Sequence, residues 1–467
     1  MGICLYNTMT RSVDEFRPIK AGGVSLYACG PTVYNYAHVG NLRTYVFEDV
    51  LKRVLRTCGY EVRHVMNVTD VGHLVSDADE GEDKMTLGAR REGKSVHEIA
   101  EFYFQAFCND MARLNLIEPD VWCKATEHIA EQIELVRKLE QKGYTYVIEH
   151  DGVYFDTSKL PDYGKLGRLD LEGLRAGARV SLAAGKRNPT DFALWKFSPK
   201  GARRLMEWQS PWGVGFPGWH IECSAMAIKH LGRRLDIHCG GVDHVNIHHT
   251  NEIAQAEAAL GHKWVNFWMH GEFLTMPSGN ERMSKSSGEF LTLDTLEKKG
   301  YEPLAYRYFC FTAHYRQQLA FSWPAMDAAA NAFARLKRAV LDLRPEYNGG
   351  EGPLEAHISE FRAAAEDDLN MPQALAAMWA AIKDADAVKG RIYATLLEMD
   401  KVLGFGLAGM QEKELPIPAD EIEKLIAERN AARKAKDFAR ADEIRSELAA
   451  KGISLEDKPD GTIWRHA

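Results

Sequence analysis

The first half of the chain alternates short apolar runs with longer amphipathic stretches. Residues 24–28 form one apolar run, which Cys29-Gly30-Pro31 ends, and residues 62–68 form the next. The stretch between them places apolar residues on one side from about Leu42 and ends near Gly59, a residue typical of a helix C-terminus. Strand, helix and strand in this order predict a right-handed βαβ unit of a parallel sheet.

The pattern changes between about residues 119 and 204. This segment is rich in Gly, Asp and Lys, which indicates an insertion between two halves of the sheet domain. The α/β pattern then resumes with a predicted strand at 235–239, a helix at 248–260 and a further strand at 264–269.

From about Pro324 onward the pattern becomes helical. Asn370 is well placed to cap a helix that starts with Met371-Pro372. The i, i+3, i+4, i+7 spacing of a buried helix face is met by Leu375, Met378, Trp379 and Ile382. Gly and Pro residues between 404 and 418 indicate a linker, and the last fifty residues indicate a helical pair broken near Asp437 and a small polar tail.

The composition is that of an ordinary globular protein of about three domains. The chain has 467 residues, of which 45% are hydrophobic and 27% charged, and no apolar run reaches the roughly 18 residues of a membrane span. The first residues lack the blocks of a signal peptide. Eight scattered cysteines without a C-x-x-C pair argue against a disulfide scaffold, so we expect a cytoplasmic protein with no membrane association.

The net charge of −8 gives no sign of nucleic-acid binding, although an acidic protein can still bind RNA through a local basic face. Such a face could lie near the C-terminus. Within twelve residues the chain carries Arg429, Arg433, Lys434, Lys436 and Arg440. Acidic residues nearby leave the alternative of a solvated helix face with mixed charges.

A candidate nucleotide site follows the first predicted strand. His38-Val39-Gly40-Asn41 lies between this strand and its helix, at the edge of a parallel sheet where nucleotides bind. The helix N-terminus offers backbone N–H groups to phosphate, Gly40 allows close approach, and His38 can bind a phosphate oxygen. The alternative is that His38 only caps the helix.

A second candidate phosphate-binding segment lies some 240 residues further on. Arg282-Met283-Ser284-Lys285-Ser286 stands in a polar loop flanked by glycines. Two cations and two hydroxyls suit the charge that develops on a leaving pyrophosphate. A solvated loop is the alternative for this pentapeptide alone, but both motifs in this order are far more specific.

Spacing also suggests a metal site. His248 and Glu252 are four residues apart on a predicted helix, so both could bind one ion. Without further support this pair is more typical of a surface cap or a salt bridge than of a metal site. Cys29 at a strand end and Cys223 near a helix start are compatible with small core residues.

The two phosphate-binding motifs resemble the HIGH and KMSKS signatures of class I aminoacyl-tRNA synthetases. Longer stretches are similar to cysteinyl-tRNA synthetases in particular, and the similarity covers nearly the whole chain. These stretches are residues 31–41, 191–196, 218–226 and 248–255.

The resemblance implies an enzyme that activates L-cysteine with Mg²⁺-ATP to cysteinyl-adenylate and transfers it to the terminal ribose 2′-OH of tRNA(Cys). It implies that the phosphates are stabilised by His38, Asn41 and Lys285, and that the nucleotide is bound by Gly40, Asp243, Arg282, Ser284 and Ser286. It implies a zinc ion held by Cys29, Cys223, His248 and Glu252. We expect the substrate thiolate to become an added ligand in a pocket lined by Thr69 and Trp219, and the enzyme to be a monomer.

Selection by a metal is physically sensible because cysteine and serine differ by one atom. An uneven apolar fit discriminates only about 10–200-fold, whereas zinc binds a thiolate far better than a hydroxyl.

Three departures from the family pattern stand out. Asn41 replaces a His that is usual in the class, Arg282 replaces a Lys, and Cys239 adds a thiol that could compete for zinc.

The predicted fold class is therefore an α/β, Rossmann-like catalytic domain with an insertion, followed by an all-α helical bundle and a small C-terminal module. The segments are 1–118 and 205–285 (catalytic halves), 119–204 (insertion), 286–323 (signature loop and stem contact), 324–403 (bundle), 404–415 (linker) and 416–467 (anticodon module, with Trp464 available to stack on a base).

The closest rival is a ligase of the mycothiol type, which joins cysteine to an amino sugar by the same adenylation but lacks a comparable C-terminal module. More distant rivals are a shorter nucleotidyltransferase and a non-catalytic RNA-binding paralogue.

Overall fold

A computed structural model gives the fold of the chain. It describes residues 2–72, 93–171, 185–199, 204–276, 291–411, 417–458 and 461–466. Contacts divide the chain into two units, Met1–Ala408 and Gly409–Ala467, and each unit is described by itself. Among the described residues, no helix has both the length and the apolar content that crossing a membrane requires.

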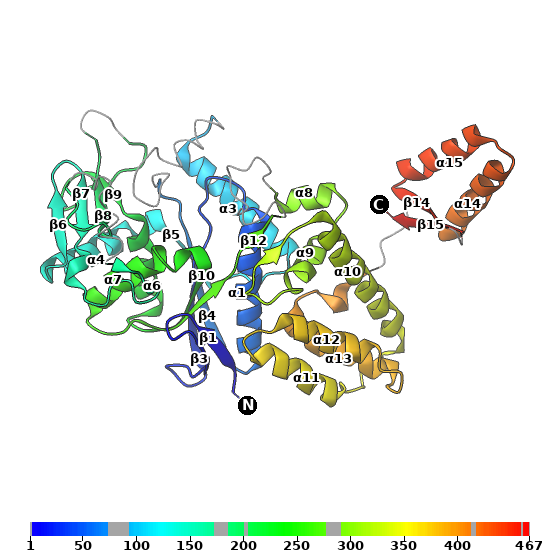
Figure 1. The fold of residues 1–467 in the computed structure, drawn as a ribbon, viewed down its shortest axis with the longest axis horizontal. Coiled ribbons are helices and arrows are strands. Elements are labelled where there is room, and N and C mark those ends of the chain that lie inside the picture. Colours follow the sequence, from blue (N-terminus) through cyan, green and yellow to red (C-terminus); the bar gives the residue numbers. More distant parts are fainter. Residues whose placement is uncertain are drawn as a thin grey trace. The chain divides into compact units, whose positions relative to one another are not determined.

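The first unit is built around a five-stranded sheet in which every neighbouring pair is parallel (Figure 1). Its strands are β3 (Gly23–Ala28), β4 (Glu61–Val68), β5 (Val121–Lys124), β10 (Leu235–Gly241) and β11 (Val265–Gly271). Their order across the sheet is β11-β10-β3-β4-β5, which is the Rossmann order with its reversal between β3 and β10. The predicted Rossmann-like class is confirmed, and each of the four strands expected from the sequence overlaps an observed one.

Helices cover both faces of this sheet, so its strands are apolar along most of their length. The covering helices that carry site residues are α1 (Val39–Thr57), α6 (Trp219–Leu231) and α7 (His248–Leu260). The predicted end of α1 is confirmed, because Gly59 follows the helix with a φ of 86°, a left-handed conformation that favours glycine.

A second, antiparallel sheet belongs to the region predicted as an insertion. It consists of β6 (Thr145–Ile148), β7 (Gly152–Phe155), β8 (Phe192–Phe197) and β9 (Gly215–Pro217), and α4 (Ile129–Gln141) packs near it. Strands do not follow the predicted boundaries at either end. β5 lies within 119–204 yet pairs with β4 of the parallel sheet, whereas β9 lies beyond 204 yet pairs with β8.

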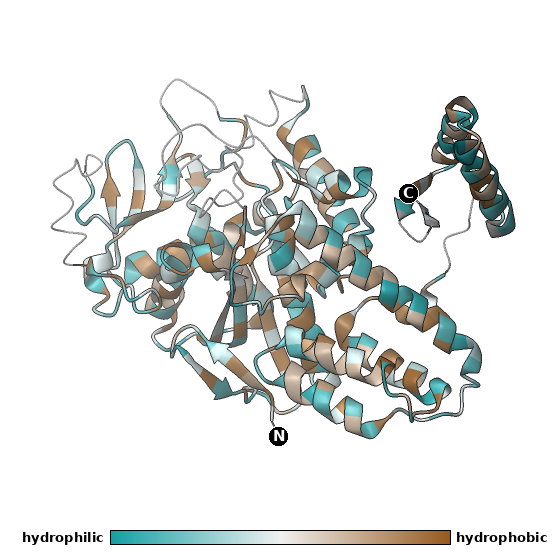
Figure 2. Cartoon of the chain, turned by 45° about the vertical axis from the view of Figure 1, so that its right-hand side comes forward, coloured by the Kyte–Doolittle hydropathy of each residue, from teal (hydrophilic) through white to brown (hydrophobic). Residues whose placement is uncertain are grey.

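Helices dominate the remainder of the first unit, and Figure 2 shows helices that carry hydrophobic as well as hydrophilic residues. They are α3 (Val96–Arg113), α8 (Leu293–Lys298), α9 (Pro303–Cys310), α10 (Trp323–Leu343), α11 (Glu355–Glu366), α12 (Met371–Ile382) and α13 (Lys389–Leu403). The predicted cap of α12 is confirmed, since the Asn370 side chain accepts a hydrogen bond from the backbone N–H of Gln373. Short pairs complete the unit: β1 (Cys4–Asn7) with β2 (Ser12–Glu15), and β12 (Leu274–Thr275) with β13 (Leu319–Ala320).

The segment predicted as a linker begins with buried residues. Gly404 ends α13 in a left-handed conformation, and the side chains of Phe405 and Leu407 that follow are fully buried. The Phe405 ring packs against those of Tyr308 and Phe311. The glycines of this segment indicated a flexible linker. The two apolar side chains between them, Phe405 and Leu407, nevertheless pack into the first unit.

The second unit contains α14 (Ala419–Lys434), α15 (Phe438–Ala450) and a hairpin of β14 (Ile453–Lys458) and β15 (Gly461–His466). The break predicted near Asp437 is confirmed, because the Asp437 side chain caps α15 by accepting from the backbone N–H of Arg440. The tail predicted as polar is this hairpin, whose Ile453 joins the apolar core of the unit. That core consists of Ile422, Ile426, Ile444, Leu448 and Ile453.

Candidate active site

A cavity opens at the point where the strand order reverses, beyond the carboxyl ends of β3 and β10. There the backbone N–H of Cys29 donates to the carbonyl of Cys239 at 3.2 Å. The cavity has a volume of about 320 Å³, in the range of small-molecule sites. It brings together residues from four separate stretches of sequence. Five of the predicted site residues line it: Cys29, His38, Asn41, Trp219 and Asp243.

The N-terminus of α1 forms one wall of this cavity. His38 caps the helix: its Nδ1 accepts from the backbone N–H of Asn41 at 3.0 Å, and Asn41 Oδ1 accepts from the backbone N–H of His38 at 3.4 Å. The capping alternative raised from the sequence is therefore correct, and it is compatible with ligand binding. With Nδ1 acting as an acceptor, the ring proton resides on Nε2, which makes Nε2 a donor. A Cβ on Gly40 would lie 3.0 Å from this Nδ1, so the close-packed turn favours glycine.

The four residues predicted to bind metal meet beside the cavity, which one of them, Cys29, lines. The ligand atoms of Cys29, Cys223, His248 and Glu252 lie within 4.8 Å of one another, and all four side chains are buried. Cys29 follows β3, Cys223 lies on α6, and the other two occupy the first turns of α7. Two thiols, one imidazole and one carboxylate in one buried cluster are a donor set that suits zinc.

A second set of ligands overlaps the first and was missed by the sequence reasoning. It consists of Cys29, Glu252, His238 and His249, again within 4.8 Å of one another. Glu252 belongs to both sets: its Oε1 lies 3.1 Å from His248 Nε2, and its Oε2 lies 3.0 Å from His238 Nε2. The sequence signal that could have identified His249 as a ligand is its position directly after His248. Cys239, suspected as a competitor for zinc, belongs to neither set among the described residues.

Electrostatics in this cluster favour charge despite burial. Burial raises the pKa of Cys29 well above its usual value, while the hydrogen bond from Cys29 lowers the pKa of Cys223 to about 7. Burial alone would favour the neutral forms of His248 and Glu252. Nearby charges outweigh burial: Glu252 and Cys223 raise the pKa of His248 to about 10, and His238 and His248 lower the pKa of Glu252 to about 2. Charge is therefore favoured at His248 and Glu252, whereas burial favours the neutral thiol at Cys29.

Trp219 and Thr69, predicted to line the thiol pocket, lie beside this cluster. Trp219 is the first residue of α6, and its ring centroid is 5.4 Å from that of His248. Thr69 is buried, and its hydroxyl donates to Glu222 Oε2 at 3.4 Å. Trp219 lines the cavity, whereas Thr69 is not among its lining residues.

The remaining predicted site residues are distributed between the cavity rim and a segment outside the described structure. Asp243 is exposed on the short helix η3 (Val242–His244) that follows β10. The loop residues Arg282, Ser284, Lys285 and Ser286 lie outside the described residues.

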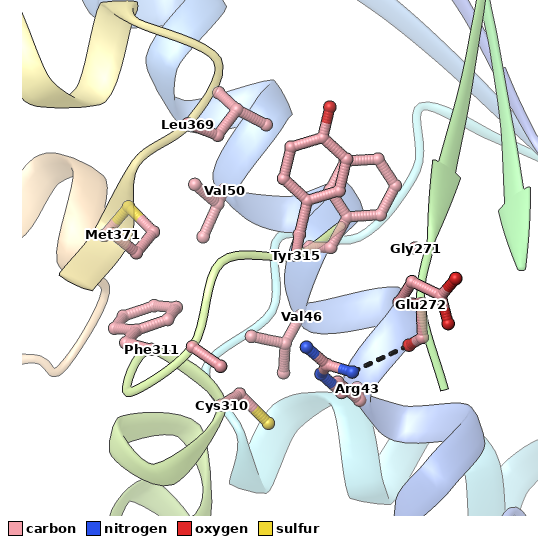
Figure 3. Close-up of a pocket in the computed structure, with 12 residues that line it drawn as sticks. Arg43, Val46, Val50, Gly271, Glu272, Cys310, Phe311, Tyr315, Leu369 and Met371 are labelled. Carbon is pink, nitrogen blue, oxygen red and sulfur yellow. Dashed lines mark hydrogen bonds between the residues drawn. The ribbon is translucent and has the colours of Figure 1, made fainter. Parts of the chain in front are cut away.

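A second, much smaller cavity lies between α1, the end of α9 and the start of α12 (Figure 3). Its volume of about 20 Å³ accommodates one water molecule and no substrate. The Arg43 guanidinium at its edge donates to the carbonyls of Glu272 at 2.8 Å and Phe273 at 2.6 Å. Arg43 therefore has a structural role, since its hydrogen bonds join α1 to the segment after β11.

Family models place both units among known proteins. A model described as the class I (C) tRNA synthetase catalytic domain matches residues 15–331, and one described as the cysteinyl-tRNA ligase anticodon binding domain matches residues 417–465. Two structures of methionyl-tRNA synthetase from Mycobacterium tuberculosis with methionyl-adenylate share the fold at 16% identity. Their TM-scores are 0.52 and 0.54, with 83% and 82% of this chain and 90% and 89% of theirs covered. Fold and cavity thus define a class I aminoacyl-tRNA synthetase.

Sequence relatives narrow this class. The chain is 53% identical over 461 residues to cysteine–tRNA ligase 1 of Burkholderia lata, with 99% of this chain and 96% of that protein covered. It is 46% identical over 493 residues to the cysteine–tRNA ligase of Treponema denticola, with 100% of both covered. The chain belongs to the cysteine–tRNA ligase family of class I synthetases.

Proposed function

We propose that this enzyme activates L-cysteine with Mg²⁺-ATP, transfers the cysteinyl group to the terminal ribose 2′-OH of tRNA(Cys), and selects the thiol with a zinc ion. One observation carries the proposal. A single cavity of about 320 Å³ runs from the capped N-terminus of α1, suited to phosphate, to Cys29, behind which the three other buried ligands meet. A ligand with a thiol at one end and a nucleotide at the other fits this arrangement.

The phosphate end is attributed to α1 and its cap. In the activation step a carboxylate oxygen of cysteine attacks the α-phosphorus of ATP, the bond to the bridging oxygen breaks, and pyrophosphate leaves with that electron pair. The backbone N–H of Gly40, the dipole of α1 and Nε2–H of His38 would stabilise the added negative charge, since the N–H groups of Val39 and Asn41 already donate to Leu291 and His38. Asn41 supports this role by holding His38 in the capping geometry. We assign the remaining charge stabilisation to Lys285 and Arg282, and the ribose to Asp243.

The thiol end is attributed to Cys29, Cys223, His248 and Glu252. A zinc ion in this set supplies a soft Lewis acid that favours a thiolate over a hydroxyl. The protein excludes water from this end, because all four side chains are buried. Trp219 closes the pocket beside His248. Discrimination against serine would then exceed the roughly 10–200-fold that an apolar fit supplies, without an editing site.

We assign recognition of tRNA to the second unit. Three of the five cations noted in the sequence form ion pairs within the unit: Arg429 and Arg433 bind Asp457, and Arg440 binds Glu428. The indole N–H of Trp464 donates to Glu423. Base contacts of this unit would therefore depend on shape and stacking more than on a surplus of positive charge.

The proposal is tested by ATP–pyrophosphate exchange and by charging of tRNA(Cys) with labelled cysteine. We expect both activities in zinc-loaded protein, and a large loss of preference for cysteine over serine in protein stripped of zinc. Cys223→Ser should lose bound zinc and this preference together. Cys239→Ala is the matched control, because Cys239 is an equally buried thiol outside both ligand sets. Undiminished preference for cysteine without zinc would remove the metal from recognition, and exchange without charging would favour the amino-sugar ligase.

A further inference from the structure

His244 occupies the wall of the cavity between the metal-ligand cluster and the nucleotide end. It is the last residue of η3, directly after Asp243. Its ring centroid lies 5.1 Å from that of His248 and 5.1 Å from that of His249. On another side it rests on Gly240, where a Cβ would come within 2.6 Å of His244 Nδ1. Packing on these sides holds the ring in position.

The two ring nitrogens of His244 lie in different surroundings. Nδ1 is closed off from solvent and has no hydrogen-bond partner among the residues that the structure describes. An imidazole carries at least one N–H, and leaving that N–H buried without an acceptor is unfavourable. The proton therefore belongs on Nε2. Since the ring lines the cavity while Nδ1 is buried, the edge that meets a ligand carries Nε2–H.

We propose that His244 binds the carboxyl group of the amino acid substrate through Nε2–H. The inference rests on the proposed function, which puts the thiol near Cys29 and Trp219 and the nucleotide near His38 and Asp243. The part of the ligand between these ends is the carboxyl group that reacts with the α-phosphate. A carboxylate is the strongest acceptor there, and a donor held by packing loses little freedom when it binds.

The role differs from that of the phosphate-binding residues. A hydrogen bond to the carboxyl group is present both in bound cysteine and during its reaction, so its loss weakens binding more than turnover. We expect His244→Leu to raise the KM for cysteine about 10-fold, since hydrogen bonds to charged groups have this strength or more. The KM for ATP and the zinc content should stay within about 2-fold of the unmodified enzyme, because His244 belongs to neither ligand set.

Three thiol ligands identify the group that His244 contacts. Cysteine carries thiol, ammonium and carboxylate; 3-mercaptopropionate lacks the ammonium, and cysteamine lacks the carboxylate. Binding of each to the zinc-loaded full chain is measured by calorimetry. His244→Leu should weaken cysteine and 3-mercaptopropionate about 10-fold and leave cysteamine unchanged. His244→Gln, which keeps a side-chain N–H, should recover most of the affinity. His262→Leu, at a half-buried histidine outside the cavity and both ligand sets, is the matched control.

The other outcomes overturn the assignment. Equal weakening of all three ligands would mean that His244 acts on the thiol end, weakening of cysteine and cysteamine only would mean an ammonium contact, and no weakening would mean no contact. Failure of the proposed function looks different, because the unmodified protein would then show no cysteine-dependent exchange. Binding is measured directly, so the comparison of ligands stands in either case.

Discussion

His64 provides a sensitive test of how burial controls the pH dependence of stability. It lies on β4 with an exposed fraction of 3%, and neither ring nitrogen has a hydrogen-bond partner in the described structure. Burial, and to a smaller extent the nearby Lys52 ammonium, lowers the pKa of His64 to about 3. In the unfolded chain a histidine titrates near 6.5.

The direction and size of the effect follow from linkage. Between pH 3 and 6.5 the unfolded chain binds a proton at His64 that the folded protein does not, so stability rises with pH in this window. The contribution is fully present above about pH 6.5 and is lost as the pH falls. At pH 5, which is 1.5 units below the unfolded value, protonation favours the unfolded state by about 2 kcal/mol.

We expect His64→Leu to remove this penalty. The free energy of unfolding of the unmodified protein should fall between pH 7 and pH 5 by about 2 kcal/mol more than that of the variant. At pH 7 the variant should be at least as stable, because two unpaired buried nitrogens are replaced by apolar atoms. Urea titrations at both pH values, followed by tryptophan fluorescence of the first unit, give the difference. Other titrating groups cancel because both proteins share them.

A control isolates burial from the loss of a histidine as such. His97→Leu removes an exposed histidine from α3 and should leave the difference between the two pH values unchanged. Equal acid destabilisation of His64→Leu and the unmodified protein would refute the reasoning. It would mean that His64 does not stay neutral in the folded state.

Three further predictions concern the site and its support. Gly40→Ala should raise the KM for ATP about 10-fold in exchange assays, because its Cβ would press on the His38 ring at 3.0 Å; an unchanged KM would show that the cap does not bind phosphate. Ile444→Ala should destabilise the second unit by about 2–5 kcal/mol in thermal melts and reduce charging of tRNA while exchange persists; parallel loss of both activities would contradict the independence of the units. Arg307→Met should destabilise the first unit by about 3–5 kcal/mol in urea, since it removes one of the two arginines paired with the buried Asp49 carboxylate and the donor to the carbonyls of Leu114 and Leu403; a smaller effect would mean that Arg53 alone balances the charge of Asp49.

The candidate site shows how far local reasoning extends. His38 and Gly40 were identified because a glycine and a polar residue at the start of a helix have a recognisable local pattern. The i, i+4 pair of His248 and Glu252 was visible for the same reason. Neither pattern could show that His38 uses one ring nitrogen as a cap and leaves the other as the donor, because this depends on the geometry of one hydrogen bond.

His238 and His244 illustrate the opposite case. Both lie in an apolar or Gly-rich stretch around β10 with no spacing that relates them to a ligand set. Their positions depend on α7 packing against the sheet, which brings Glu252 to within 3.0 Å of His238 and His248 to His244. Phe405 is similar, since a glycine-rich segment gave no sign that an aromatic ring would be buried there.

Sequence alone determined the elements of this protein and the residue types at its strand ends, because helix and strand periodicity, caps and glycine turns act over a few residues. It also determined the family, through motifs that stay together along the chain. The tertiary structure decided which of these pieces meet: the reversal of strand order between β3 and β10 creates one cavity, and α6 and α7 bring three more ligands to Cys29 at its edge. Contacts between residues some 200 positions apart follow from how helices pack on the sheet, and no local pattern carries that information.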